Sequence, residues 1–149
     1  VLTLIGDAGK GALAVGLTVL YTGESPIAGF DAPLAGAMAF LGHLYPVFHG
    51  FKGGKGVATA AGVLLALNLW LGIATLATFG IIVALFRMIS LASIIAAVFS
   101  VCYAFFLFGE TPITPVVGAI ALLLVWRHRE NIGRLLRGAE PRLGEKKTT

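Results

Sequence analysis

Hydrophobic residues dominate six segments of the chain, and polar residues, glycine and proline gather between them. The segments cover residues 10–21, 32–45, 57–67, 69–86, 90–108 and 113–126. An α-helix needs about 20 residues to cross a bilayer, so the second and third segments are short enough to be tilted, broken or re-entrant. Asn68 separates the third segment from the fourth, and Trp70 follows it as an interfacial aromatic residue. We therefore predict an all-α, polytopic helical bundle with about six hydrophobic elements, some of them short or re-entrant.

The composition places this bundle in a membrane. Of the 149 residues, 58% are hydrophobic and only 12% are charged, and the mean hydropathy is +0.94. These values lie well outside the usual range of soluble domains. The single cysteine, Cys102, excludes a disulfide framework and a thiolate metal cluster. We predict one membrane-embedded domain over residues 1–137 and a polar, mobile, cytoplasmic tail over residues 138–149.

The charged residues sort by side if the six segments alternate across the bilayer. One face then receives every lysine and arginine of the chain, and the other face receives Glu24, Asp31 and Glu110. By the positive-inside rule the basic face is cytoplasmic, so both ends of this chain lie on that side. An even number of crossings is supported, because a miscounted span would scatter the basic residues over both faces.

The loop between the second and third segments has the most distinctive chemistry. Residues 42–59 read GHLYPVFHGFKGGKGVAT, and the polar part of this loop comprises Lys52, Gly53, Gly54, Lys55 and Gly56. Glycine lets backbone N–H groups approach a phosphate closely, lysine supplies charge, and the following helix directs its positive dipole end to the same place. The loop is not a Walker A motif, because Lys55 is followed by glycine rather than Ser or Thr. We predict an anion site; a topology signal that contacts anionic lipid is the alternative.

A second polar cluster, RHRENIGR at residues 127–134, follows the last hydrophobic segment without a break. If the helix continues, His128 and Asn131 lie on one face, with Arg127 and Arg134 approximately aligned with them. A histidine that titrates near neutrality, beside an amide and two guanidinium groups, suits a site that holds a phosphate and a hydroxyl together. An interfacial basic cap is the alternative interpretation.

Two pairs of polar residues and one histidine are further candidates. Ser90 and Ser93 lie at the start of the fifth segment, where N-capping explains one of them and both can donate to an anion. Asp7 and Lys10 are also explained as an ion pair at the membrane edge, and His43 as a structural hydrogen-bonding residue. The three histidines are scattered and have few carboxylates nearby, so we expect no metal site.

These motifs resemble a known family. Residues 42–59 are similar to the central motif of the bacterial acyl-phosphate:glycerol-3-phosphate acyltransferases, the PlsY family. Three other stretches agree in the same order, namely DAGKG at 7–11, ISLAS at 89–93 and HRENIGRL at 128–135. The resemblance covers about residues 7–140, and the central motif is highly specific.

The resemblance implies transfer of a fatty acyl group from acyl phosphate to the 1-hydroxyl of sn-glycerol 3-phosphate. The products are lysophosphatidic acid and phosphate, at an entry step of phospholipid biosynthesis. The implied location is the bacterial inner membrane, with several spans and an active site that faces the cytoplasm. The implied partners are acyl phosphate, glycerol 3-phosphate and membrane lipids, without a cofactor, a metal or nucleic acid.

The resemblance also assigns roles to residues. His128 and Asn131 would be catalytic and orient glycerol 3-phosphate. Substrate phosphate would be bound by a basic, glycine-rich and serine-containing set: Lys52, Gly53, Gly54, Lys55, Gly56, Ser90, Ser93 and Arg134. Three residues would support the site: Asp7, Lys10 and His43. A phosphate oxygen of the substrate is an alternative to His128 as the proton acceptor.

One departure concerns the N-terminal region. The family carries a first transmembrane helix and a motif rich in Ser, Gly and Asn before the DAGKG element, and this sequence lacks both. We therefore expect residues 1–137 to form an N-terminally truncated acyltransferase domain, where the full-length family has seven spans. We also expect this fragment alone to be inactive or nearly so.

A small transporter or channel for a phosphorylated metabolite is the alternative function. The short central segments favour it, because discontinuous helices often surround a transport site. The absence of an inverted repeat and of a charged residue deep inside a span disfavours it.

Overall fold

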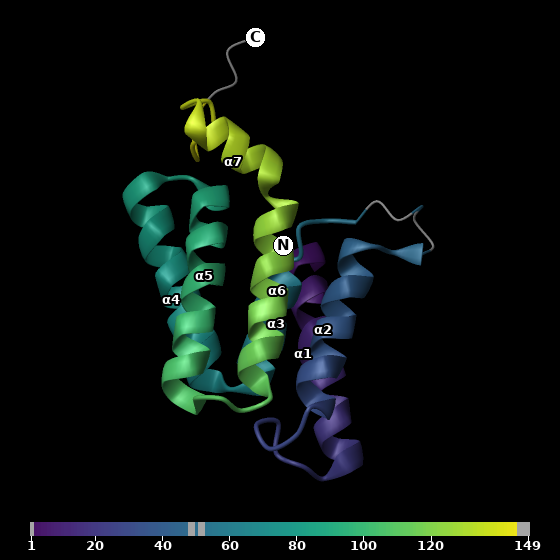
Figure 1. The fold of residues 1–149 in the computed structure, drawn as a ribbon. Helices are drawn as coiled ribbons and strands as arrows, with labels where there is room; N and C mark the ends of the chain where they lie inside the picture. Colours follow the sequence, from purple (N-terminus) through teal and green to yellow (C-terminus); the bar gives the residue numbers. More distant parts are fainter. Residues whose placement is uncertain (1, 48–49, 51–52, 146–149) are drawn as a thin grey trace.

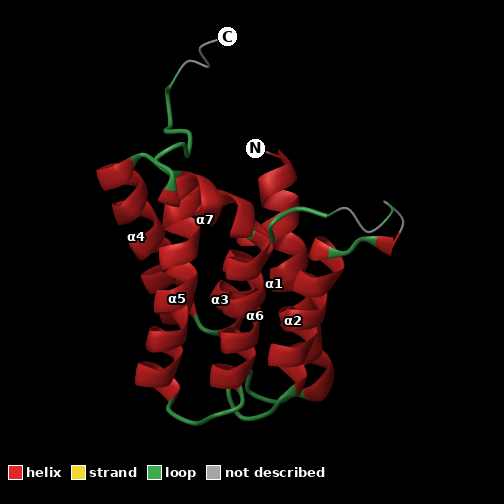
Figure 2. Ribbon diagram, turned by 45° about the horizontal axis from the view of Figure 1, so that its top comes forward, coloured by secondary structure: helices red, strands yellow, loops and turns green. Residues whose placement is uncertain are grey.

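The computed structural model describes residues 2–47, 50 and 53–145, and the regular structure within these ranges is helical. The helices are α1 (Leu2–Thr22), α2 (Asp31–Leu44), α3 (Val57–Leu67), α4 (Leu69–Phe86), α5 (Ile89–Phe108), α6 (Ile113–Arg127) and α7 (Arg129–Leu136). Helices α1 to α6 run alternately up and down as a bundle, and α7 lies at one end of it (Figures 1 and 2). This arrangement confirms the predicted all-α bundle.

Five of the six predicted segments agree with a helix to within one residue at each end. Asn68 separates α3 from α4 as predicted, and its side-chain Oδ1 accepts a hydrogen bond from the Leu71 N–H at 3.1 Å. This contact is an N-cap, which satisfies one of the free N–H groups at the start of α4. The first segment differs, because α1 begins at Leu2 instead of residue 10.

Helices α1 and α3 approach each other closely because glycine stands where they meet. A Cβ atom on Gly11 would lie 2.5 Å from the Thr59 carbonyl oxygen, and a Cβ atom on Gly62 would overlap the Ala8 backbone. Small residues permit this backbone approach between membrane helices. The contact offsets the low helix propensity of the glycine-rich stretch 6–11. The predicted start of the first helix was wrong for this reason.

We expect Gly62→Ala to lower the free energy of unfolding by about 1–3 kcal/mol, since an added methyl group overpacks a tight contact. Thermal unfolding of the detergent-solubilised chain measures this. The matched control is Gly16→Ala in α1, where a Cβ atom meets nothing within 4 Å. That control should raise stability by about 0.5–1 kcal/mol through helix propensity. Equal unfolding temperatures for Gly62→Ala and the unaltered chain would contradict the described contact.

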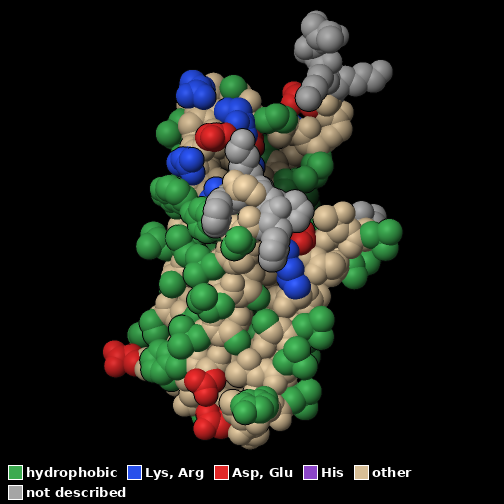
Figure 3. Space-filling view, turned by 90° about the vertical axis from the view of Figure 1, so that its right-hand side faces the viewer, with side chains coloured by type: hydrophobic (Ala, Val, Ile, Leu, Met, Phe, Trp, Pro, Cys, Tyr) green, Lys and Arg blue, Asp and Glu red, His purple; other side chains and the backbone are tan. Residues whose placement is uncertain are grey.

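The outer surface of the bundle suits a membrane. Helices α1, α4 and α5 are long and apolar enough to cross a bilayer, and α3 and α6 are shorter apolar helices. Helices α2 and α3 have 14 and 11 residues, which confirms that the second and third elements are short. On the face in Figure 3, Lys and Arg side chains lie near the top and down to mid-height, and the charges at the lower end are acidic. The two ends of the bundle therefore differ in charge, as the alternating segments predicted.

Candidate active site

The loop before α3 meets the C-terminal helices at the basic end of the bundle. The Lys55 ammonium donates a hydrogen bond to Asn131 Oδ1 at 2.6 Å. The Arg127 guanidinium donates to the carbonyl oxygens of Gly53 at 2.8 Å and Gly54 at 3.1 Å. The two polar clusters found in the sequence therefore form one site, although more than 70 residues separate them.

Gly56 lets the loop enter α3. Its φ is +79°, in the left-handed region that a residue with a side chain rarely adopts. A Cβ atom at this position would also overlap the Phe40 ring. The glycine therefore has a conformational role, and it places the first residue of α3 two residues after Lys55.

A polar cavity of about 490 Å³ lies beside this loop. Among the described residues, three cationic side chains, Lys55, Arg134 and Arg142, line it with one carboxylate, Glu140. The remaining lining comprises Val57, Ile89, Ser90, Ser93, His128, Asn131, Pro141, Leu143 and Gly144. The excess of cations over carboxylates suits a phosphate ligand, because guanidinium and ammonium groups bind phosphate oxygens directly.

An apolar cavity, also of about 490 Å³, lies next to the polar one. Side chains of α3, α4, α5 and α6 form its walls, with few polar groups among them. The two cavities share four lining residues: Val57, Ile89, Ser93 and Leu143. A ligand with an anionic head and a hydrocarbon tail can therefore occupy both at once.

His128 lies between α6 and α7 and is 1% exposed. Its φ and ψ are −93° and 9°, so α6 ends at Arg127 and α7 begins at Arg129. The expected continuous helix is interrupted at His128, whose backbone N–H donates to two carbonyls of α6, those of Leu124 and Val125. A backbone N–H that is shared between the carbonyls three and four residues before it is common at helix ends. The break redirects α7 across the bundle end (Figure 2).

The hydrogen bonds of His128 define which ring nitrogen carries a proton. Nδ1 lies 2.8 Å from the Leu124 carbonyl oxygen, which only accepts, so Nδ1–H is the donor and neutral Nε2 has a free lone pair. Burial lowers the pKa of His128 below 6.5; the Leu124 carbonyl opposes this shift, and the Lys55 charge adds to it. The ring is therefore neutral near pH 7, and Nε2 can accept a proton.

A pH dependence of stability follows from this lowered pKa. Because the folded value lies below the ordinary 6.5, the neutral ring stabilises the fold fully above pH 6.5, and this contribution is lost as pH falls through the folded pKa. We expect the unfolding temperature to decrease over this range more steeply than in His128→Asn, which has no titrating ring. Thermal unfolding at a series of pH values measures this. Parallel curves for the two proteins would contradict a lowered pKa.

Glu140 belongs to the site, and the sequence did not single it out. Its carboxylate accepts hydrogen bonds from Asn131 Nδ2 at 2.6 Å and Arg134 Nε at 2.7 Å, and its side chain is 6% exposed. Burial raises the pKa of Glu140, but the nearby Ser90 hydroxyl, Asn131 and Arg134 together hold it below 4.5. The carboxylate is therefore ionised. In the sequence, the only signal for Glu140 was its position as a single acidic residue within a basic stretch.

The described part of the tail, residues 138–145, is held against the bundle. The Leu143 N–H donates to the Arg87 carbonyl at 2.7 Å, and the Arg87 guanidinium donates to the Leu143 carbonyl at 2.5 Å. With Glu140, these contacts place the tail over the polar cavity. The predicted mobility of the tail stays a prediction.

The two serines of α5 differ in their hydrogen bonds. Ser93 Oγ donates to the Ile89 carbonyl at 2.9 Å. Ser90 Oγ is buried and has no hydrogen bond of good geometry among the described residues. Both serines line the polar cavity. The Ser90 hydroxyl lies near the Glu140 carboxylate, so its one hydrogen can reach a ligand only when the hydroxyl turns away from that carboxylate.

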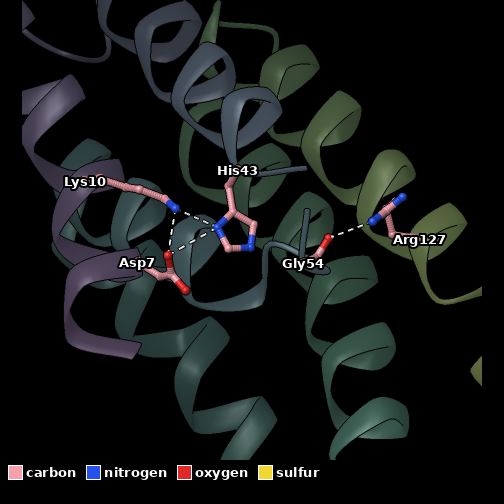
Figure 4. A network of polar contacts seen from close by, with 5 residues as sticks. All are labelled: Asp7, Lys10, His43, Gly54 and Arg127. Carbon is pink, nitrogen blue, oxygen red and sulfur yellow. Dashed lines mark hydrogen bonds and ion pairs between the residues drawn. The ribbon is translucent and has the colours of Figure 1, made fainter. Parts of the chain in front are cut away.

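The remaining predicted residues lie on the other side of the loop. Asp7, Lys10 and His43 contact one another, and Gly54 separates them from Arg127 (Figure 4). Lys52 lies outside the described residues. Of the predicted site residues, the polar cavity brings together Lys55, Ser90, Ser93, His128, Asn131 and Arg134.

The fold is that of an all-α integral membrane protein. Its site combines a cationic cavity with an adjacent apolar one. The sequence profile of the family described as "Glycerol-3-phosphate acyltransferase" matches residues 1–138. The chain belongs to this family.

Relatives and solved structures agree with this assignment. The chain is 54% identical to a glycerol-3-phosphate acyltransferase of Ralstonia nicotianae, over 99% of this chain and 71% of that protein. It is 52% identical to one of Paraburkholderia phymatum, over 99% of this chain and 70% of that protein. Two crystal structures of PlsY (YgiH), an integral membrane glycerol 3-phosphate acyltransferase, are 37% identical and cover 96% of this chain and 70–71% of those chains. Their TM-scores are 0.89 for the lysophosphatidic acid form and 0.90 for the glycerol 3-phosphate form.

Proposed function

We propose that the adjacent cavities are the place where a fatty acyl group passes from acyl phosphate to glycerol 3-phosphate. The observation that carries this proposal is that a cationic cavity and an apolar one of equal size, about 490 Å³ each, share four lining residues. An acyl phosphate has an anionic head and a hydrocarbon tail, so it matches both. The acceptor needs only the polar part, since it is small and charged.

Binding of the two phosphates falls to the cationic and hydroxyl groups of the polar cavity. Lys55 is held by Asn131, and Arg134 is held through its Nε by Glu140, which leaves its terminal nitrogens for a ligand. The Ser90 hydroxyl would donate to the ligand after turning away from the nearby Glu140 carboxylate. The N–H groups of the glycine loop and the N-terminus of α3 favour an anion at the same place. Asn131 would position the Lys55 ammonium through the hydrogen bond that its Oδ1 accepts.

The chemistry requires alignment more than activation, because acyl phosphate is already a mixed anhydride. The 1-hydroxyl oxygen of glycerol 3-phosphate bonds to the acyl carbon, and the bond from that carbon to the phosphate oxygen breaks. Phosphate leaves with the electron pair. His128 Nε2 accepts the hydroxyl proton, as its neutral tautomer permits. Lys55 stabilises the negative charge that develops.

The identity of the acyl donor gives a direct test of this proposal. The chain would be produced with any coding sequence that precedes it in its gene, and acyl transfer to radiolabelled glycerol 3-phosphate would be measured. Palmitoyl phosphate should support transfer, and palmitoyl-CoA at the same concentration should not. Transfer from palmitoyl-CoA alone would overturn the proposal, because that donor carries no phosphate on its acyl carbon.

We also propose that this site faces the cytoplasm of a bacterial inner membrane. The support is the concentration of Lys and Arg at the end of the bundle that holds the polar cavity. In a Cys102→Ser background, a membrane-impermeant thiol reagent should label Ser25→Cys on intact cells and should not label Ala139→Cys. Both positions are exposed: Ser25 is in the connection between α1 and α2, and Ala139 follows α7, which lies at the other end of the bundle. The reverse labelling pattern would contradict the orientation.

A further inference from the structure

Three polar side chains of α1 and α2 form a network that takes no direct part in the chemistry above. The Lys10 ammonium lies 2.7 Å from Asp7 Oδ1 and 2.6 Å from His43 Nδ1. His43 Nδ1 lies 3.3 Å from Asp7 Oδ1. The His43 side chain is 15% exposed, and Asp7 is 25% exposed. The network therefore joins α1 and α2, and Gly54 lies between it and Arg127 (Figure 4).

The network sets the state and the orientation of the His43 ring. An ammonium group only donates hydrogen bonds, so Nδ1 accepts from Lys10 and the ring hydrogen lies on Nε2. Asp7 holds the Lys10 ammonium in place by an ion pair. The Nε2 edge of the ring then meets Gly54, where a Cβ atom would lie 2.5 Å from Nε2. The glycine loop therefore packs against the His43 ring at Gly54.

Arg127 holds the same loop from the opposite side. Its guanidinium donates to the carbonyls of Gly53 and Gly54, and it lies over the Tyr45 ring at 5.6 Å from the ring centre. Gly54 therefore lies between the His43 ring and the Arg127 guanidinium (Figure 4). The next residue along the chain is Lys55, whose ammonium reaches Asn131.

We propose that Asp7, Lys10 and His43 are positioning residues that hold the glycine loop so that Lys55 meets the substrate phosphate. This inference rests on the proposed function, because it assigns the network a role in binding glycerol 3-phosphate. The network acts through the loop and touches neither substrate. A loop that is held in place before binding loses less conformational entropy when the ligand arrives.

The expected kinetic effect is a change in binding. His43→Ala should raise KM for glycerol 3-phosphate by about 10-fold and leave kcat within about 2-fold, as expected when ground-state and transition-state binding weaken equally. Asp7→Asn should change KM in the same direction, since Lys10 then loses its ionic partner. Lys10→Arg, which keeps the charge and the donors, should restore most of the affinity lost in Lys10→Ala.

A double-mutant cycle tests the contact itself. Gly54→Ala should raise KM because its Cβ atom overlaps His43 Nε2, and it should add little in the His43→Ala background, where the ring is absent. Gly53→Ala is the matched control. Its Cβ atom would overlap the backbone carbonyls of His43 and Leu44, which remain in both backgrounds. It should therefore be equally damaging with or without the His43 ring.

The outcomes separate this inference from the proposed function. Non-additive effects of His43→Ala and Gly54→Ala on KM, with additive effects for Gly53→Ala, support the positioning role. Additive effects for both glycines, or a fall in kcat with KM unchanged, overturn it while leaving the acyltransferase function in place. Absence of acyl transfer by the unaltered chain, produced with any preceding coding sequence of its gene, overturns both.

Discussion

Lys55→Ala is expected to lower acyl transfer to glycerol 3-phosphate by about 100- to 1,000-fold, the usual cost of removing one preorganised donor from a developing negative charge. Lys55 lines the polar cavity, and its ammonium is fixed on Asn131 at 2.6 Å. Loss of this cation removes the group best placed to meet a phosphate oxygen. Initial rates with palmitoyl phosphate and glycerol 3-phosphate measure the effect.

Arg129→Ala is the matched control for this loss of positive charge. Arg129 begins α7, lies 4.5 Å from the centre of the Trp126 ring and is not among the residues that line the polar cavity. The control should keep its rate within about 2-fold, since an exposed cation contributes little to a site that it does not touch. A Lys55→Ala protein as active as Arg129→Ala would contradict the assignment of Lys55.

His128→Ala is expected to lower kcat by about 100- to 10,000-fold, the range for loss of a general base. The buried ring is held by Leu124 through Nδ1–H and presents the lone pair of Nε2. Without that lone pair, the attacking hydroxyl loses the proton acceptor that the proposed mechanism assigns to it. Single-turnover rates with saturating glycerol 3-phosphate separate this loss from a change in binding.

His128→Asn distinguishes catalysis from support of the fold. The asparagine amide has a donor near the place of Nδ1, so the hydrogen bond to the Leu124 carbonyl is retained, and the acceptor at Nε2 is lost. The His128→Asn protein should be as inactive as the His128→Ala protein, and it should unfold at a higher temperature than His128→Ala. A His128→Asn protein with a near-normal rate would show that a substrate phosphate oxygen takes the proton instead.

The helices were predictable from the sequence because apolar runs, with Asn68 between two of them, follow the needs of a membrane span. The start of α1 was not, since it depends on contacts made by Gly11 and Gly62 across the bundle. A sequence shows that glycine is a poor helix former, and only the packed structure shows what it allows to approach. The break at His128 was also not predictable from the sequence, because it depends on how α7 meets the loop before α3.

The site was predictable where residue type and spacing carry the chemistry. Glycines beside Lys55, and His128 three residues before Asn131, predicted an anion site, and the structure brings Lys55, His128 and Asn131 to one cavity. Glu140 was missed because one acid in a basic tail has no pattern, and its role appears only when the tail turns back onto Asn131 and Arg134. The contact of Lys10 with His43 was missed for a similar reason, since it joins residues of two helices.

The most direct test of the central claim is the stoichiometry of the reaction in lipid vesicles. The chain, produced with any preceding coding sequence of its gene, would be given palmitoyl phosphate with and without glycerol 3-phosphate, and phosphate and lysophosphatidic acid would both be measured. We expect phosphate release to depend on glycerol 3-phosphate, with one lysophosphatidic acid formed for each phosphate released. Phosphate release that is independent of glycerol 3-phosphate, or the absence of lysophosphatidic acid from the products, would contradict an acyl transfer site in the adjacent cavities.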